Sequence, residues 1–173
     1  METLKAIARR KSTRSYRQDQ ISDEVLNTIL AAGCAAPVGM GKYDSLHLTV
    51  IQDKAVLKNI SASISKIMDT EADMLYSAPT VVLISSKDID IPGVDYVNVG
   101  CVLENMAIAA ADQKIDNGIV WGVGMAVSAD IQLAKALDIP ESFKPVGSIA
   151  LGYATTPNEV EKEMKVTISM NHV

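Results

Sequence analysis

Cysteines and aromatic residues are scarce in this chain. Its 173 residues include two Cys, one Trp and one Phe, and aromatic residues make up only 4% of the sequence. Cys34 and Cys101 lie far apart, without C-x-x-C spacing or a cluster of histidines, so neither a disulfide framework nor a zinc site is expected. A reducing, cytoplasmic setting is the interpretation that this cysteine usage favours.

The chain also lacks a membrane-length apolar run and a broad excess of basic residues. Its longest apolar tract, Val94–Ala111, contains four polar positions, which is typical of a buried helix rather than a membrane span. The first residues contain no apolar core of a secretory signal. A formal net charge of −5 argues against a general nucleic-acid or membrane-surface role. We therefore expect neither nucleic acid nor a membrane as a partner.

The residues that are present fit one globular domain over residues 1–173, with 48% apolar and 21% charged residues. Apolar spacing predicts a series of elements. In chain order these are a short helix around Leu4–Ala8, a helix capped by Ser22, strand Leu46–Ile51, a helix capped by Asp53, a central strand Thr80–Ser85, the long helix Val94–Ala111, a glycine-rich turn, a helix from Ser128 to Leu137, and strands Val146–Tyr153 and Lys165–Met170. This order predicts an α+β fold with helices around a small sheet.

A basic cluster follows the first helix, with the sequence Arg9-Arg10-Lys11-Ser12-Thr13-Arg14. If the segment is extended, the side chains of Arg10, Ser12 and Arg14 leave the same side of the backbone and can converge on one ligand. Guanidinium and hydroxyl donors suit a phosphate. Taken alone, these six residues also fit a solvated basic helix end.

Two features favour a homodimer over a self-contained monomer. Apolar residues wrap most of the way around the helix Val94–Ala111, which exposes more apolar surface than one neighbouring sheet can cover. The strand Lys165–Met170 follows a polar stretch long enough to reach the sheet edge of another subunit. The alternative is a central helix that is sandwiched within one subunit.

Four separated motifs resemble the nitroreductase family of FMN-dependent oxidoreductases. They are Arg10-Lys11-Ser12-Thr13-Arg14, Ala36-Pro37-Val38-Gly39-Met40, Glu104-Asn105-Met106-Ala107-Ile108-Ala109-Ala110, and Leu137-Asp138-Ile139-Pro140 with the later Ile149-Ala150-Leu151-Gly152-Tyr153. The resemblance covers nearly the whole chain. It implies a small, mostly antiparallel central sheet flanked by helices, in an intertwined homodimer with C-terminal strand exchange.

The resemblance also implies the cofactor site. Arg10 and Ser12 are expected at the FMN phosphate and Arg14 at the N1/O2 edge of the ring, where a cation stabilises negative charge on the reduced flavin. Backbone N–H groups of the turn Gly122–Gly124 are expected near N5 or O4. The full expected set is Arg10, Lys11, Ser12, Arg14, Pro37, Val38, Gly39, Met40, Lys42, Trp121, Gly122, Val123 and Gly124. Longer members of the family supply a C-terminal cation to the phosphate; Lys162 and Lys165 are the candidates for it here, and the sequence leaves open whether either one takes that role.

The implied activity is hydride transfer from NAD(P)H through flavin N5 to a flat, electron-poor small molecule such as a nitroaromatic compound or a quinone. It needs no protein nucleophile and no metal. Two other interpretations stay open, namely a non-catalytic FMN carrier or redox-sensing dimer, and a structural dimer without a ligand. The glycines of Gly39–Lys42 and Gly122–Gly124 lack the spacing of a P-loop or a dinucleotide fingerprint.

Overall fold

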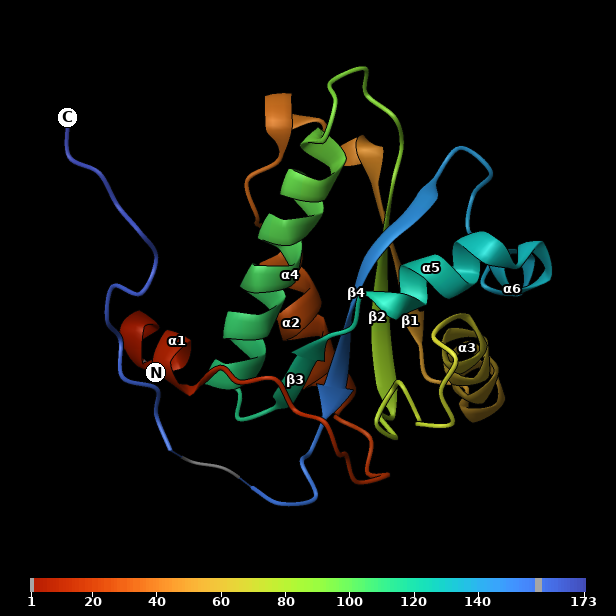
Figure 1. Cartoon of the computed structure of the whole chain (residues 1–173), viewed down its shortest axis with the longest axis horizontal. Coiled ribbons are helices and arrows are strands. Elements are labelled where there is room, and N and C mark those ends of the chain that lie inside the picture. Colours follow the sequence, from red (N-terminus) through yellow and green to blue (C-terminus); the bar gives the residue numbers. More distant parts are fainter. Residues whose placement is uncertain (1, 158–159) are drawn as a thin grey trace.

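A four-stranded antiparallel sheet with the order β1-β2-β4-β3 organises the chain (Figure 1). The computed structural model describes residues 2–157 and 160–173. The elements are α1 (Thr3–Arg9), α2 (Asp23–Cys34), η1 (Gly39–Gly41), η2 (Tyr43–Ser45), β1 (Leu46–Ile51), α3 (Lys54–Ile67), β2 (Thr80–Ser86), α4 (Val94–Asp112), β3 (Asp116–Ile119), α5 (Gly122–Ala129), α6 (Ile131–Ala136) and β4 (Lys144–Gly152). The predicted α+β class is confirmed.

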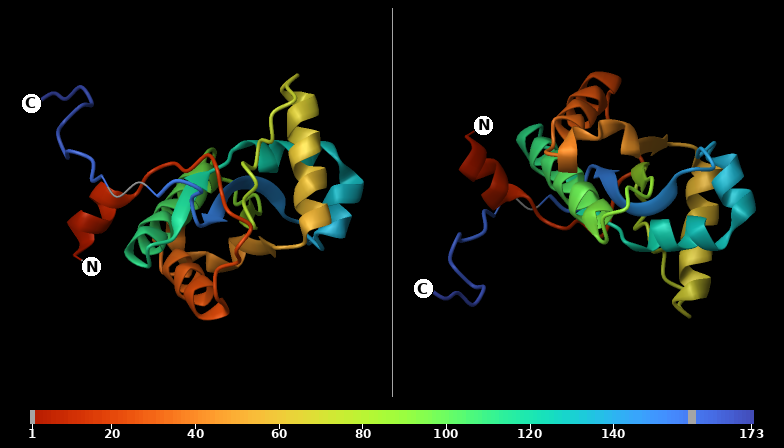
Figure 2. Two further views of the ribbon diagram at one scale, coloured as in Figure 1. Left: turned by 90° about the horizontal axis from the view of Figure 1, so that it is seen from below. Right: turned by 90° about the horizontal axis from the view of Figure 1, so that it is seen from above.

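Strand β2 lies inside the sheet and divides the core into two halves. All seven of its residues are buried, as its continuous apolar sequence predicts. Val81 and Leu83 pack with α3, α5 and α6, whereas Val82 and Ile84 pack with α2 and α4. This alternation follows the two-residue period of a strand. Figures 1 and 2 show the two groups of helices on opposite faces of the sheet.

The predicted helix starts at α2 and α3 are confirmed. Ser22 Oγ accepts a hydrogen bond from the Val25 N–H at 3.4 Å. Asp53 Oδ1 accepts from the N–H groups of Ala55 and Val56 at 2.8 and 3.0 Å. Each cap satisfies backbone donors that the first helical turn leaves unpaired. The predictions of α1, α4, β1 and β4 are also confirmed, with small differences at the ends.

The prediction was wrong about the segment between β3 and β4. Gly122–Gly124 is not a turn but the beginning of α5, and the helix predicted from Ser128 starts six residues earlier. A Cβ at Gly122 would come within 2.7 Å of Ile64 Cγ2, so the close approach of α5 to α3 requires glycine here despite its low helix propensity. Asp130 then interrupts the helix and caps α6 through the N–H groups of Gln132 and Leu133.

Strand β3 was not expected, because its sequence Asp116-Asn117-Gly118-Ile119 has low strand propensity. Its register is set by pairing with β4, in which Gly118 lies opposite Ala150. Its other edge faces the basic segment, since Ser12 forms a parallel bridge to Asn117. Tertiary pairing therefore builds this strand, and it places the basic segment at the edge of the sheet.

Residues 160–173 leave the body of the molecule beside α1 (Figure 1). The strand predicted over residues 165–170 is not formed within the single chain. The side chains of this stretch are exposed, and a strand needs a partner edge for its backbone groups. Exchange of this strand with a second subunit stays a prediction. In the parts of the chain that the structure describes, no helix has the length and apolarity to cross a membrane.

Candidate functional site: a cation-lined cavity at the sheet edge

A cavity of about 480 Å³ lies where the basic segment meets the end of α4 and the start of β3. The segments that line it are distant in sequence, and they are residues 9–15, the stretch from Ala111 to Asn117, and Ala154–Pro157. The predicted site residues Arg10, Lys11, Ser12 and Arg14 all belong to this lining. The structure thus brings the N-terminal motif together on one cavity.

Backbone hydrogen bonds hold the basic segment in place. The Thr13 N–H donates to the Asn117 carbonyl oxygen at 2.8 Å, and the Arg17 N–H donates to the Tyr153 carbonyl oxygen at 2.8 Å. The Thr155 N–H donates to the Ser15 carbonyl oxygen at 3.1 Å. The segment is therefore fixed to β3 on one side and to the chain after β4 on the other.

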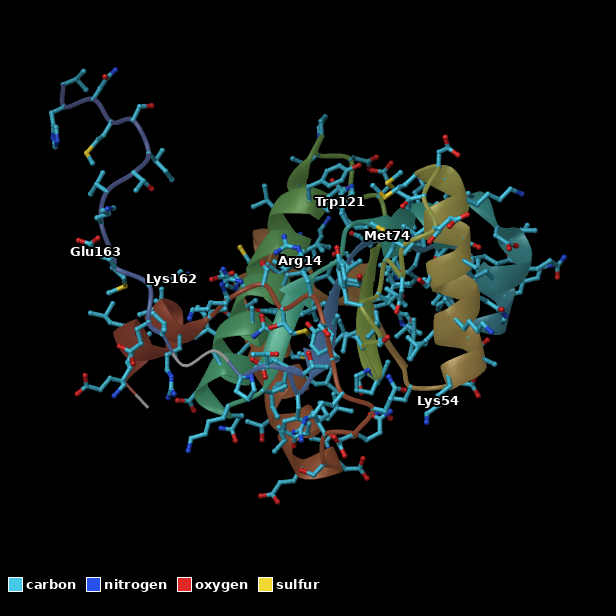
Figure 3. All side chains as sticks on the ribbon, turned by 60° about the horizontal axis from the view of Figure 1, so that its bottom comes forward. Arg14, Lys54, Met74, Trp121, Lys162 and Glu163 are labelled. Carbon is cyan, nitrogen blue, oxygen red and sulfur yellow. The ribbon has the colours of Figure 1, made fainter. Side chains whose placement is uncertain are left out.

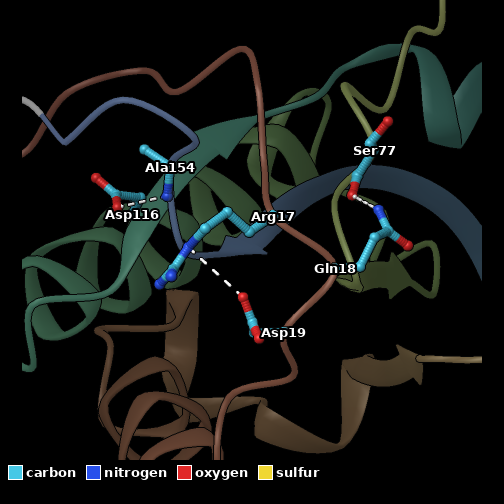
Figure 4. A network of polar contacts seen from close by, with 6 residues as sticks. All are labelled: Arg17, Gln18, Asp19, Ser77, Asp116 and Ala154. Carbon is cyan, nitrogen blue, oxygen red and sulfur yellow. Dashed lines mark hydrogen bonds and ion pairs between the residues drawn. The ribbon is translucent and has the colours of Figure 1, made fainter.

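Side chains around the next residues strengthen this anchoring (Figure 4). Gln18 Nε2 donates to the Ser77 carbonyl oxygen at 2.9 Å. Asp116 Oδ2 accepts a hydrogen bond from the Ala154 N–H at 2.8 Å. Arg17 pairs with Asp19 at 3.6 Å, on the surface outside the cavity. Two of these contacts connect distant loops, so the segment is positioned by more than its own backbone.

The buried side chain of Tyr16 anchors the chain just after the basic segment to the core. It is 3% exposed, and its hydroxyl lies 3.5 Å from the Ala150 carbonyl oxygen as a donor. Burial, and to a smaller degree the nearby Asp116 carboxylate, raise the pKa of Tyr16 well above its ordinary value. The phenol therefore stays neutral at physiological pH and serves as a packing and hydrogen-bonding group.

The lining of the cavity is strongly cationic. It contains one carboxylate, Asp116, and five basic side chains, which are those of Arg9, Arg10, Lys11, Arg14 and Lys114. Among the described residues, no carboxylate lies within ion-pair distance of the Arg10 or Arg14 guanidinium. Their charge is available to an anion, because no internal ion pair neutralises it.

One buried amide adds a hydrogen-bond acceptor to this lining. Asn117 is 2% exposed, and its Nδ2 donates to the carbonyl oxygens of Ala107 and Ile115. Its Oδ1 has no hydrogen-bond partner among the described residues. A buried acceptor without a partner is costly, and a ligand hydroxyl would satisfy it. The cations of the lining fit the phosphate of a cofactor such as FMN.

The loop residues Pro37, Val38, Gly39, Met40 and Lys42 do not line this cavity. The loop is anchored instead to the beginning of α4. The Gly39 N–H donates to Oδ1 of Asn98 at 2.9 Å, and Asn98 is 2% exposed. Met40 adopts a positive φ of 57° and is 62% exposed, so its side chain is presented at the surface.

Trp121, Gly122, Val123 and Gly124 also lie outside the lining of this cavity. Trp121 precedes α5, and its ring stacks on Tyr96 with centroids 6.1 Å apart. The first N–H groups of an α-helix have no partner within the helix. The N–H groups of Gly122–Gly124 therefore belong to the first turn of a helix and not to the expected turn, and Val123 and Gly124 are buried.

Sequence reasoning missed Lys114 as a lining residue. It follows α4 with a positive φ of 59° and belongs to none of the motifs found in the sequence. The predicted C-terminal cation Lys162 lies beside α1, where its N–H donates to the Ala8 carbonyl oxygen at 2.9 Å (Figure 3). Lys165 pairs instead with Glu163 at 3.1 Å on the exposed tail.

Comparisons with known proteins agree with this architecture. The model of the nitroreductase family matches residues 7–153. A provisionally named NADH dehydrogenase/NAD(P)H nitroreductase of Archaeoglobus fulgidus is 34% identical over 156 residues, which cover 88% of this chain and 85% of that protein. The chain therefore belongs to the nitroreductase family.

Solved structures show the same fold. A nitroreductase with bound FMN from Bacteroides fragilis superposes with a TM-score of 0.85 at 26% identity, covering 100% of this chain and 99% of that one. A nitroreductase with bound FMN from Desulfitobacterium hafniense also gives a TM-score of 0.85, at 24% identity, covering 99% and 97%. The predicted nitroreductase fold is thus confirmed over essentially the whole chain.

Proposed function

We propose that this chain is an FMN-dependent oxidoreductase that passes reducing equivalents from NAD(P)H to a flat, electron-poor acceptor such as a nitroaromatic compound or a quinone. The observation that carries the proposal is the cavity with five basic side chains and one carboxylate. Family membership supports it, since two related structures contain FMN and a relative is named for NAD(P)H and nitro compounds.

Residues of the basic segment hold the cofactor in this proposal. Arg10, Lys11 and Ser12 bind the phosphate, because guanidinium, ammonium and hydroxyl groups donate charge-assisted hydrogen bonds to its oxygens. Arg14, two residues beyond Ser12 in the extended segment, reaches the pyrimidine edge of the ring.

FMN supplies the redox chemistry when bound, by accepting a hydride from NAD(P)H and delivering it to the acceptor. The protein tunes and shields that chemistry. The Arg14 guanidinium favours negative charge at the ring edge and so raises the reduction potential. The N–H groups at the start of α5 orient the ring by donating hydrogen bonds. No side chain serves as a nucleophile.

The proposal includes a homodimer with a shared site. Met40, Tyr96, Val97 and Trp121 are all more than half exposed in the single chain. Burial of such apolar surface is the main driving force for association. The loop Pro37–Lys42 covers the flavin of the partner subunit, which explains why it does not line the cavity of its own chain. Residues 165–170 pair with the partner's sheet edge.

Steady-state kinetics test the proposed activity. The purified protein should contain FMN, and oxidation of NADH or NADPH should depend on added menadione or a nitroaromatic compound. Parallel double-reciprocal plots are expected, because donor and acceptor visit the same flavin in turn. Bound FMN without any acceptor-dependent turnover would favour a carrier or sensor instead. Light scattering on the same sample gives the mass of the dimer.

A further inference from the structure

Lys114 occupies a backbone position that suits glycine better than lysine. Helix α4 ends at Asp112, and Lys114 follows with φ at 59°, in the left-handed region. Its N–H donates to the Ala111 carbonyl oxygen at 3.2 Å, and the Ile115 N–H donates to the Ala110 carbonyl oxygen at 2.8 Å. Helices commonly end in this way, and the left-handed residue is usually glycine because a Cβ is disfavoured there.

The side chain at this strained position lies on the cation-lined cavity. Lys114 lines the cavity together with the basic segment, although 100 residues separate it from Arg14. Among the described residues, no carboxylate is within ion-pair distance of its ammonium group. A lysine therefore stands at a position favoured for glycine and adds positive charge to a lining that already contains four other cations.

We infer that the Lys114 ammonium is an anion-binding group of this cavity and contributes, together with the basic segment, to holding the FMN phosphate. This inference rests on the proposed function. Phosphate affinity is gained here at the expense of backbone stability, since the left-handed conformation disfavours any residue with a Cβ. Such a trade predicts that stability and cofactor affinity respond to substitution with opposite signs.

The variant Lys114→Gly tests whether stability and FMN affinity change in opposite directions. In flavin-free protein, the melting temperature should rise by about 2–4 °C, because glycine relieves the backbone strain of a left-handed residue in a chain of this size. In a titration with FMN, the Kd should rise roughly 3- to 10-fold through the loss of one exposed charge-assisted contact. Lys114→Arg keeps the charge and should retain the wild-type Kd.

Asp138→Gly provides the matched control. Asp138 also adopts a positive φ, of 50°, but it follows α6 and does not line the cavity. Its replacement should raise the melting temperature by less than Lys114→Gly, because aspartate tolerates the left-handed region better than lysine, and should leave the Kd for FMN unchanged. The control thus shows how relief of strain alone affects the protein.

The outcomes are distinguishable. If the wild-type protein binds no FMN after reconstitution, the proposed function fails. If the wild-type protein binds FMN and Lys114→Gly binds it equally well, the inference about Lys114 is overturned while the proposed function stands. A higher Kd for FMN in both Lys114→Gly and Lys114→Arg also overturns the inference about Lys114, because the positive charge is then not what binds the phosphate.

Discussion

The backbone N–H of Thr13 donates to the carbonyl oxygen of Asn117 at 2.8 Å, and this bond joins the N-terminal basic segment to the edge strand β3. Ser12 and Asn117 form a parallel bridge at the same place. The functional groups before and after Thr13 are therefore positioned by a strand more than 100 residues away in the sequence. The basic segment Arg9–Arg14, which is the cofactor clamp of the proposed function, is thus joined to the edge of the sheet at one bridge.

Gly118→Ala tests this coupling between β3 and the clamp. A Cβ at Gly118 would lie 3.0 Å from the Thr13 carbonyl oxygen and 3.4 Å from the Tyr16 hydroxyl. We expect unfolding free energy to fall by about 1–3 kcal/mol, as in other overpacked sites, and FMN affinity to fall with it. Urea unfolding and an FMN titration measure the two effects. An unchanged unfolding free energy together with an unchanged FMN affinity would show that Gly118 and the basic segment are not tightly packed against each other.

Arg10→Ala and Arg14→Ala test the clamp directly. Each removes charge-assisted hydrogen bonds of about 1.5–3 kcal/mol, so the Kd for FMN should rise roughly 10- to 100-fold. Flavin retained on ultrafiltration, or a fluorescence titration, gives the Kd. Arg17→Ala is the control, since Arg17 lies outside the cavity and pairs with Asp19. Equal FMN retention in all three variants would refute the clamp.

The proposed function places Trp121 near the flavin ring, so its fluorescence is expected to report on FMN binding. Trp121 is the only Trp in the chain and is 54% exposed next to the start of α5. Binding of FMN should quench its emission strongly, because the flavin absorbs at the wavelengths at which tryptophan emits. Trp121→Phe supplies the tyrosine background. Saturation of FMN binding without any change in Trp121 emission would place the ring elsewhere.

The lowered pKa of Asp73, which lies outside the cation-lined cavity, should make the stability of the fold depend on pH. Burial alone would raise the pKa of this carboxylate, but hydrogen bonds from Ser61 Oγ and from the N–H groups of Leu75 and Ser77 outweigh it and lower the pKa. Because the pKa is lower in the folded than in the unfolded chain, the stabilisation is present at neutral pH. It is lost as the pH falls below about 4, the value in an unfolded chain.

Asp73→Asn checks that sign. The variant should unfold at a lower urea concentration than the wild-type protein at pH 7, and the two midpoints should converge as the pH is lowered through the acidic range. A difference between the midpoints that stays constant with pH would show that the carboxylate charge contributes nothing.

Much of the fold could be predicted from local sequence, because the relevant signals are local. Ser22 and Asp53 cap helices through contacts within three residues. The continuous apolar run of β2 predicts that the strand is buried on both faces. Strand β3 could not be predicted, since Asn117 and Gly118 become strand residues only through pairing with β4. The start of α5 could not be predicted for a similar reason, because the glycine at position 122 reflects a close approach to Ile64 that is distant in sequence.

Some residues of the candidate site could be predicted from the sequence and others could not. The basic segment was visible as a cluster of adjacent residues, and the structure places Arg10 and Arg14 on one cavity. Lys114 and Asn117 were not visible, because they reach that cavity only through the three-dimensional pairing of β3 with the segment. Neither Lys114 nor Asn117 belongs to a short motif. The one signal in the sequence is a lysine just after the end of a helix, where glycine is more common.

Anaerobic titration of the flavin-loaded protein with NADH and NADPH tests the central claim most directly. We predict that the visible absorption of bound FMN bleaches on addition of at least one of the two donors and returns when menadione is added. Bound FMN that stays oxidised with both donors, or a protein that takes up no FMN at all, would contradict the proposed oxidoreductase.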